Sequence, residues 1–154
     1  MSSNNIIVDD DDELITYTGS AESWYHGGND FEYDNTTHGS MTGGIPTQAR
    51  FSFNETRIRV HGTIAPNDEI PPISMYTLDD YPTSTYTAAT TQATLYRVQF
   101  YDSGILEYGQ HELVIVPLTN QSTSVWLDYL LYTLSSGLSS PTRRHLFLCY
   151  AWPN

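Results

Sequence analysis

Aromatic, acidic and histidine side chains gather in two stretches of the 154-residue chain, residues 19–47 and residues 79–81. Sugars present apolar C–H faces and a rim of hydroxyl groups, which proteins hold by aromatic stacking and by polar side chains on loops. The candidate carbohydrate-binding residues of these types are Trp24, Tyr25, His26, Tyr33, Asp34, His38, Asp79 and Asp80. In this prediction Trp24 or Tyr25 stacks on a sugar face, while the acidic residues and His38 bond its hydroxyl groups. For His26 and His38 the alternative is that they are plain loop residues.

One carboxylate interrupts the most apolar stretch of the chain, residues 125–133. Apolar side chains occupy both alternating faces of this stretch, so we expect a strand in the middle of a packed structure. Asp128 breaks the pattern, and burying an unpaired carboxylate is unfavourable by roughly several kcal/mol. Asp128 therefore needs a partner, and the sequence leaves a metal ion, an arginine and backbone N–H groups open.

The formal net charge is −12, with only six Lys and Arg residues. Such a surface repels phosphate groups, which argues against nucleic acid and anionic membranes as partners. Five consecutive carboxylates, residues 9–13, repel one another, so we expect a solvated loop there. The alternative is that one or two of them ligate a cation.

No common catalytic motif is present: the sequence has no GxSxG, P-loop, HExxH or CxxC. The enzyme alternative is a glycoside hydrolase or lyase that uses two loop carboxylates, although spacing selects no particular pair. Cys149 is the single cysteine, which excludes an intrachain disulfide, and we expect it to be buried and inert. His61 and His111 lie in strand patterns, where we expect them to face solvent or make structural bonds.

The first residues, MSSNNIIVDD, lack the basic and apolar regions of a signal peptide. The longest apolar runs are too short to span a bilayer. These features predict a cytoplasmic protein without membrane insertion, and they leave secretion by a non-standard route open.

Twelve Tyr and three Trp residues, with Ala, Lys and Glu scarce, favour an all-β fold. Period-two alternation predicts a hairpin over residues 48–61 and two strands, 112–117 and 125–133, joined by a polar turn. Further strands are predicted at residues 4–8, 14–18, 73–78 and 95–101. Seven or eight short strands without a helix are typical of an antiparallel β-sandwich or jelly roll.

Three stretches differ from this pattern. Residues 19–47 contain six Gly and one Pro, which predicts a long functional loop. Residues 83–93 are too polar for the core. Residues 135–154 follow a core at 5–134 within a single domain, 1–154, and this tail is either an added strand or a contact between subunits.

Six segments occur in a recognisable order: VDDDDELITYTG, THGSMTGG, ARFSFNETRIRVHGTI, PPISMYTLDDYP, GQHELVIVPL and WLDYLLYT. In this order they resemble a fungal, chiefly basidiomycete, family of galactose-binding-like β-sandwich modules, in the free-standing format of many mushroom lectins. In related calcium-containing carbohydrate-binding modules, a carboxylate on the last strand meets carboxylates near the N-terminus around a structural Ca²⁺. The resemblance implies that Asp10 and Asp128 form this pair, and bonding of Asp128 to backbone N–H groups or an arginine remains the alternative.

Together these observations predict a non-catalytic carbohydrate-binding lectin whose partners are glycans. No cofactor is required, and structural calcium stays an option. Because agglutination needs several sites, we expect a homo-oligomer, a dimer or higher, with the tail as its interface. A protein-interaction module is the remaining alternative, and it is favoured if the aromatic residues of 19–47 lie in the core.

Overall fold

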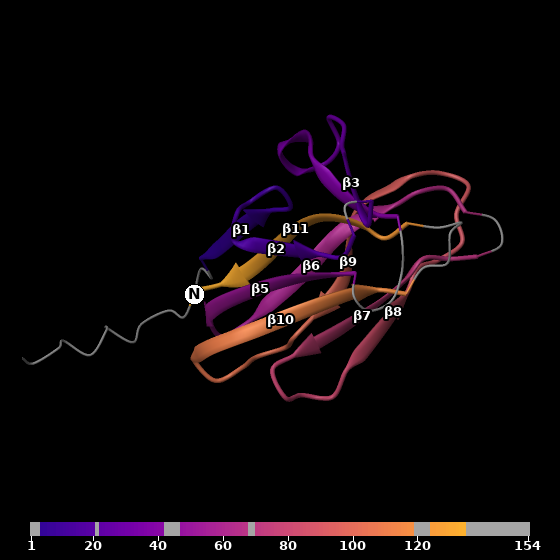
Figure 1. Ribbon diagram of the computed structural model, residues 1–154. Coiled ribbons are helices and arrows are strands. Elements are labelled where there is room, and N and C mark those ends of the chain that lie inside the picture. Colours follow the sequence, from indigo (N-terminus) through magenta and orange to yellow (C-terminus); the bar gives the residue numbers. More distant parts are fainter. Residues whose placement is uncertain (1–3, 21, 42–46, 68–69, 119–123, 135–154) are drawn as a thin grey trace, which may run out of the picture.

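The computed structural model describes residues 4–20, 22–41, 47–67, 70–118 and 124–134, which form two antiparallel sheets (Figure 1). The first sheet has the order β3 (Trp24–Gly27), β4 (Thr37–Ser40), β11 (Trp126–Thr133), β6 (Ile58–Ile64) and β9 (Leu95–Asp102), with β1 (Asn5–Asp9) also paired to β11. The second sheet has the order β2 (Ile15–Thr18), β5 (Gln48–Glu55), β10 (Gly109–Pro117), β7 (Ile73–Leu78) and β8 (Ser84–Thr87). A short 3₁₀ helix, η1 (Tyr33–Asn35), lies between β3 and β4. The predicted all-β antiparallel sandwich is confirmed.

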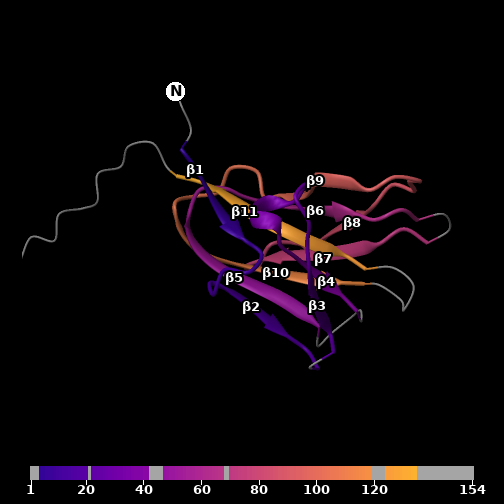
Figure 2. The same ribbon diagram turned by 90° about the horizontal axis from the view of Figure 1, so that it is seen from above.

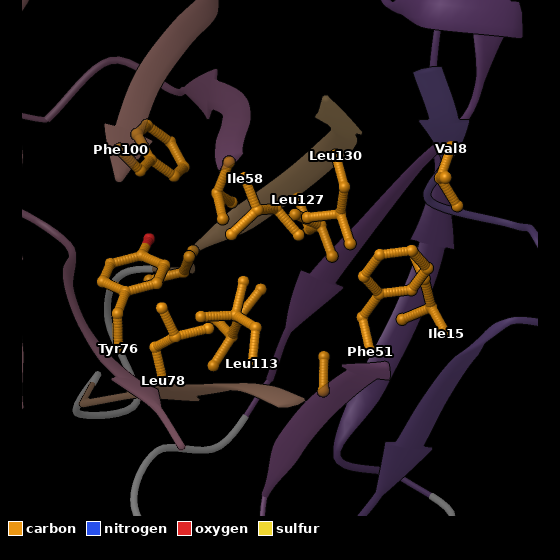
Figure 3. Close-up of a cluster of buried hydrophobic side chains, with 14 of the residues drawn as sticks. Val8, Ile15, Phe51, Ile58, Tyr76, Leu78, Phe100, Leu113, Leu127 and Leu130 are labelled. Carbon is orange, nitrogen blue, oxygen red and sulfur yellow. The ribbon is translucent and has the colours of Figure 1, made fainter. Parts of the chain in front are cut away.

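The core lies between the sheets, because successive side chains of a strand point to opposite faces. In β5, Phe51 is buried while its neighbour Ser52 is exposed. Figure 3 shows Leu113 of β10 facing Ile58 of β6 and Leu130 of β11 from the opposite sheet. Burying each such side chain stabilises the fold by about 1.5–3 kcal/mol, so the core fixes the inward face of every strand.

The prediction that residues 125–133 form a central strand is confirmed. β11 pairs with β6 along one side and with β4 and β1 along the other. On the core face of β11, Leu127 and Leu130 are buried, and on its other face Trp126, Tyr129 and Leu131 are partly buried. This position explains why both of its faces are apolar.

The hairpin predicted over residues 48–61 is wrong. β5 pairs with β2 and β10, whereas β6 pairs with β11 and β9 of the opposite sheet. β10 and β11 likewise belong to different sheets. Alternation identifies the buried face of a strand, but inner faces of both sheets have the same pattern, so it does not reveal the sheet to which a strand belongs.

Two predictions of irregular structure are also corrected. Residues 19–47 contain the paired strands β3 and β4, whose glycines hide the strand pattern. The polar stretch 83–93 contains β8, and Ala88 directly after it belongs to the core. Among the described strands β8 pairs with β7 alone, at the edge of the second sheet, so it requires few apolar side chains.

Within the described ranges, no helix is long and apolar enough to cross a membrane. The predictions for the tail, residues 135–154, and for Cys149 fall outside the described residues.

Candidate functional site

β11 changes its neighbour at Asp128. Leu127 pairs with His38 of β4. Tyr129, two residues further on, pairs with Asp9 of β1. On its other side, β11 shifts its register with β6 between Leu127 and Tyr129. A local irregularity of this kind redirects a side chain, and here it removes Asp128 from the regular alternation of the strand.

The Asp128 side chain is completely buried and only half satisfied. Its Oδ1 accepts a hydrogen bond from the backbone N–H of Tyr33 at 2.7 Å, while Oδ2 has no partner among the described residues. Burial above all, together with the nearby carboxylates of Glu32 and Asp10, raises the pKa of the Asp128 carboxyl to about 7, although the hydrogen bond from Tyr33 lowers it. The sequence left a metal ion, an arginine and backbone N–H groups open as partners of Asp128. The fold supplies one of these, the backbone N–H of Tyr33.

Asp10 is buried as well, which corrects the expectation of a solvated acidic run. Its backbone N–H donates to the carbonyl of Asp128 at 3.0 Å. Its carboxylate accepts from the Thr36 hydroxyl at 2.9 Å and contacts Nδ1 of His38 at 2.6 Å. The Tyr17 hydroxyl donates to the Asp10 carbonyl at 2.7 Å. Asp10 is thus held by groups from several separate segments.

Two of the predicted sugar-binding residues, His26 and His38, lie beside Asp10, and a third, Trp24, packs on Tyr17. His26 and His38 are direct partners on β3 and β4, with ring centroids 5.1 Å apart. The His38 ring stacks on Tyr17 at 4.3 Å, which fixes its plane. Trp24 packs against the core, meets Tyr17 edge-on at 4.8 Å, and its Nε1 donates to the Thr18 carbonyl at 2.9 Å. These contacts make Trp24 a less available sugar platform than Tyr25.

The outer face of the first sheet carries a row of residues that runs across its strands. From one end to the other, the row consists of Tyr25, Gly39, Trp126, Thr63, Glu32, Tyr96 and Phe31. Tyr25 of β3 pairs with Gly39 of β4, and Gly39 pairs on its other side with Trp126 of β11. Trp126 in turn pairs with Thr63 of β6. Tyr25 is 52% exposed and meets the Trp126 ring at 5.9 Å with an interplanar angle of 88°. A Cβ on Gly39 would lie 2.4 Å from the Trp126 ring, so only glycine lets this ring lie against β4. Tyr25 and Trp126 form an aromatic corner.

The segment between β3 and β4 covers the other end of this row, beside β6 and β11 (Figure 2). The Glu32 carboxylate is buried and accepts from the Thr63 hydroxyl and from the Asn29 N–H, both at 2.8 Å. These bonds anchor the segment on the sheet. Phe31, next to Glu32, is 66% exposed and stacks on Tyr96 of β9 at 5.1 Å.

The remaining predicted residues occupy other surroundings. The Tyr33 ring contacts Tyr129 at 5.7 Å. Asp34 is exposed in η1 with a positive φ of 46°. Asp79 follows β7 of the second sheet, where its carboxylate bonds Nδ1 of His111 and the N–H of Glu112, both at 2.7 Å. Asp80 is exposed beside it. The structure therefore does not gather all eight predicted residues around one point.

The two histidines expected to face solvent or make structural bonds behave differently. His111 makes structural bonds to Asp79 and to the Glu107 carbonyl. His61 is buried and stacks on Tyr129 at 4.6 Å, and this burial lowers its pKa.

Sequence reasoning missed four residues of the row, Phe31, Glu32, Tyr96 and Trp126. For Trp126 a signal was present, because a strand that is apolar on both faces places one aromatic face outside the core. Glu32 and Tyr96 gave no signal, since their roles depend on contacts between segments that are distant in the sequence.

Comparison with solved structures shows what this chain resembles. A family 35 carbohydrate-binding module from Clostridium thermocellum matches with a TM-score of 0.61 at 12% identity, over 84% of this chain and 98% of the module. The CBM36-1 domain of a multidomain xylanase from the hindgut metagenome of Trinervitermes trinervoides matches with a TM-score of 0.54 at 13% identity, over 88% of this chain and all of that domain. These neighbours are β-sandwich carbohydrate-binding modules, and at such identities the likeness shows the fold.

Enzymes also match, but over a part of their length. The chain spans 36% of a family two carbohydrate esterase from Cellvibrio japonicus, with a TM-score of 0.57 at 16% identity over 91% of this chain. Neither a protein-family model nor a curated protein matches the chain.

Proposed function

We propose that the chain is a non-catalytic glycan-binding module and that a sugar lies along the row from Tyr25 to Phe31. The observation that carries this proposal is the row itself, which has exposed aromatic rings at both ends. It crosses from β3 to β9, and four strand spacings correspond to about 19 Å. That length suits an oligosaccharide better than one sugar ring.

Tyr25 is the residue that we propose to stack on a sugar. Its ring is half exposed, and Trp126 stands at a right angle to it as a side wall. At the other end, exposed Asp30 directly precedes Phe31 and offers a carboxylate for hydroxyl groups, while the Asn29 amide bonds the Phe31 N–H and the Tyr96 hydroxyl. Rigid aromatic rings beside polar groups are the usual means of holding a ligand with apolar and polar faces.

Two observations favour glycan binding over the alternatives. Tyr25 and Phe31 are exposed, whereas a protein-interaction module was favoured if the aromatic residues of this region lay in the core. Asp128, whose raised pKa would suit an acid catalyst, is completely buried and cannot contact a substrate. The modules matched over their whole length also support a non-catalytic role.

A structural Ca²⁺ between Asp10 and Asp128 remains part of the proposal. The donor set fits this ion, because Ca²⁺ prefers carboxylate and carbonyl oxygens. Asp128 Oδ2 is a buried oxygen without a partner, and Asp10 lies beside it through the bond between their backbones. Bound there, Ca²⁺ would supply positive charge beside the Asp128 carboxyl, whose pKa is raised by burial and by the nearby carboxylates of Glu32 and Asp10.

We also propose that the protein is a lectin of the fungal type, which acts in the cytoplasm as a homo-oligomer. This part rests on the segment order in the sequence and on the need for several sites in agglutination.

A glycan-array screen with Tyr25→Ala and Phe31→Ala variants tests the function. Each variant should weaken binding by about tenfold, equivalent to about 1.4 kcal/mol. Tyr81→Ala is the matched control, because Tyr81 is 54% exposed and follows β7 of the second sheet. Loss in the control to the same degree would refute the proposed site, and an array without binding by the wild-type protein would refute the function.

A further inference from the structure

Two histidines face each other across the hairpin of β3 and β4. His26 and His38 are direct cross-strand partners, so their side chains leave the same face of the sheet, and their ring centroids are 5.1 Å apart. His38 is mostly buried, with 15% of its side chain exposed, whereas His26 is 53% exposed. The pair therefore extends from the interior to the surface.

A carboxylate completes the group. Donor atoms from Asp10, His26 and His38 all lie within 4.8 Å of one another. Asp10 is fully buried and its carboxylate lies 2.6 Å from Nδ1 of His38. Asp11, the next residue, has an exposed side chain whose carboxylate lies 3.8 Å from Nε2 of His26, longer than a hydrogen bond.

The residues behind the group hold it in place. Tyr17 stacks flat on His38 at 4.3 Å with an interplanar angle of 14°. The same tyrosine donates its hydroxyl to the Asp10 carbonyl, and Thr36 donates to the Asp10 carboxylate. Supporting contacts of this kind orient metal ligands in proteins and restrict their movement.

We propose that Asp10, His26 and His38 bind a divalent transition-metal ion such as Zn²⁺, with Asp11 at the open side. Two imidazole nitrogens and one carboxylate oxygen suit Zn²⁺, Ni²⁺ or Cu²⁺, whereas Ca²⁺ takes oxygen ligands. Bonds of about 2.0–2.1 Å to a tetrahedral ion place its ligands about 3.4 Å apart. The donor separations here range from 2.6 Å to at most 4.8 Å, so changes of up to about 1.4 Å in these separations bring the three donors onto one ion. The exposed side of His26 gives an ion its entry path.

This site shares Asp10 with the proposed calcium site but differs from it in its other ligands. The calcium proposal depends on Asp128 and on oxygen donors, whereas this one depends on His26 and His38. An ion here would join the connection after β1 to the β3–β4 hairpin, which also carries Tyr25. It does not rest on glycan binding.

Isothermal titration with ZnCl₂ tests the proposal on the full chain, without a histidine tag and after removal of metals with EDTA. We expect one Zn²⁺ per chain, weakened tenfold or more in His26→Ala and in His38→Gln and unchanged in Asp128→Asn. Thermal unfolding establishes that each variant is folded, and half-exposed His26 is the safer of the two substitutions. His111→Gln is a control outside the group, since His111 bonds Asp79 on the second sheet.

A second readout identifies the ligands directly. Of the five histidines in the chain, only His26 and His38 should change their imidazole NMR signals when Zn²⁺ is added. Zn²⁺ binding that is equally strong in both histidine variants, or no binding by the wild-type protein, would overturn the proposal. Loss of glycan binding in Tyr25→Ala with Zn²⁺ binding retained would separate the two sites.

Discussion

The backbone N–H of Asp10 donates to the carbonyl of Asp128 at 3.0 Å, at the point where β11 passes from β4 to β1. This bond brings the acidic run near the N-terminus beside the carboxylate of the last strand. Both side chains are completely buried. The fold thus places two carboxylates in its interior, next to the histidine pair on one side and the Glu32 segment on the other.

Asp128 should make the stability of the metal-free protein depend on pH. Burial raises the pKa of this carboxyl to about 7 in the folded protein from an ordinary value near 3.8. The folded state then binds the proton more tightly than the unfolded chain, so the free energy of unfolding falls as pH rises between about 4 and 8. Asp128→Asn cannot ionise and keeps an oxygen for the Tyr33 N–H. We expect it to remove about 2–3 kcal/mol of this change between pH 5 and pH 8.

Urea unfolding in EDTA at the two pH values provides the measurement. His111, whose pKa is raised by its bonds to Asp79 and Glu107 against the opposing effect of burial, contributes in both proteins and cancels in the difference. An identical pH dependence in wild type and variant would contradict the assignment of the effect to Asp128.

Added Ca²⁺ should stabilise the wild-type protein and leave Asp128→Asn unchanged. A ligand present at 100 times its Kd stabilises the folded state by about 2.7 kcal/mol. Thermal unfolding with EDTA and with CaCl₂ measures this shift, with Asp80→Asn as a control because Asp80 is an exposed carboxylate on the second sheet. Equal stabilisation of wild type and Asp128→Asn would show that Ca²⁺ binds elsewhere.

Gly39→Ala should disrupt the aromatic corner. The added Cβ would lie 2.4–2.8 Å from three atoms of the Trp126 ring, so the ring must move. We expect a loss of about 1–3 kcal/mol in the free energy of unfolding, a change in tryptophan fluorescence and weaker glycan binding. Gly109→Ala is the control, because a Cβ there meets no atom within 4 Å. A Gly39→Ala protein with unchanged fluorescence would show that Trp126 is not held against Gly39.

Glu32→Gln should loosen the segment that carries Phe31. The two Glu32 oxygens both accept hydrogen bonds, from Thr63 and from Asn29, and a glutamine retains one acceptor oxygen only. Leaving a buried donor unpaired is unfavourable by about 1–3 kcal/mol. Faster amide hydrogen exchange at Asn29 and Phe31 should report the loosening, with Leu113 in the core as the internal reference. Unchanged exchange at both Asn29 and Phe31 would mean that the paired oxygens of Glu32 do not anchor the segment.

The sequence by itself determined the fold class and the need for a partner at Asp128. Buried and exposed residues alternate along β5, β7 and β10 because each strand turns one face to the core. This alternation involves neighbouring residues only, so it is visible in the sequence. The same reasoning identified β11 as central. It also predicted Trp24 or Tyr25 as the stacking residue, on the basis of composition, without deciding between the two.

Only the tertiary structure decided which strands share a sheet and which side chains meet. The pairing of His26 with His38, the right angle between Tyr25 and Trp126 and the burial of Asp10 each depend on where separate segments come together. Inner strands of both sheets alternate with the same period of two, so the pattern could not show that β5 and β6 belong to different sheets. It also could not show which of Trp24 and Tyr25 is exposed. Those choices are made by packing between distant segments, whose contacts leave no pattern along the chain.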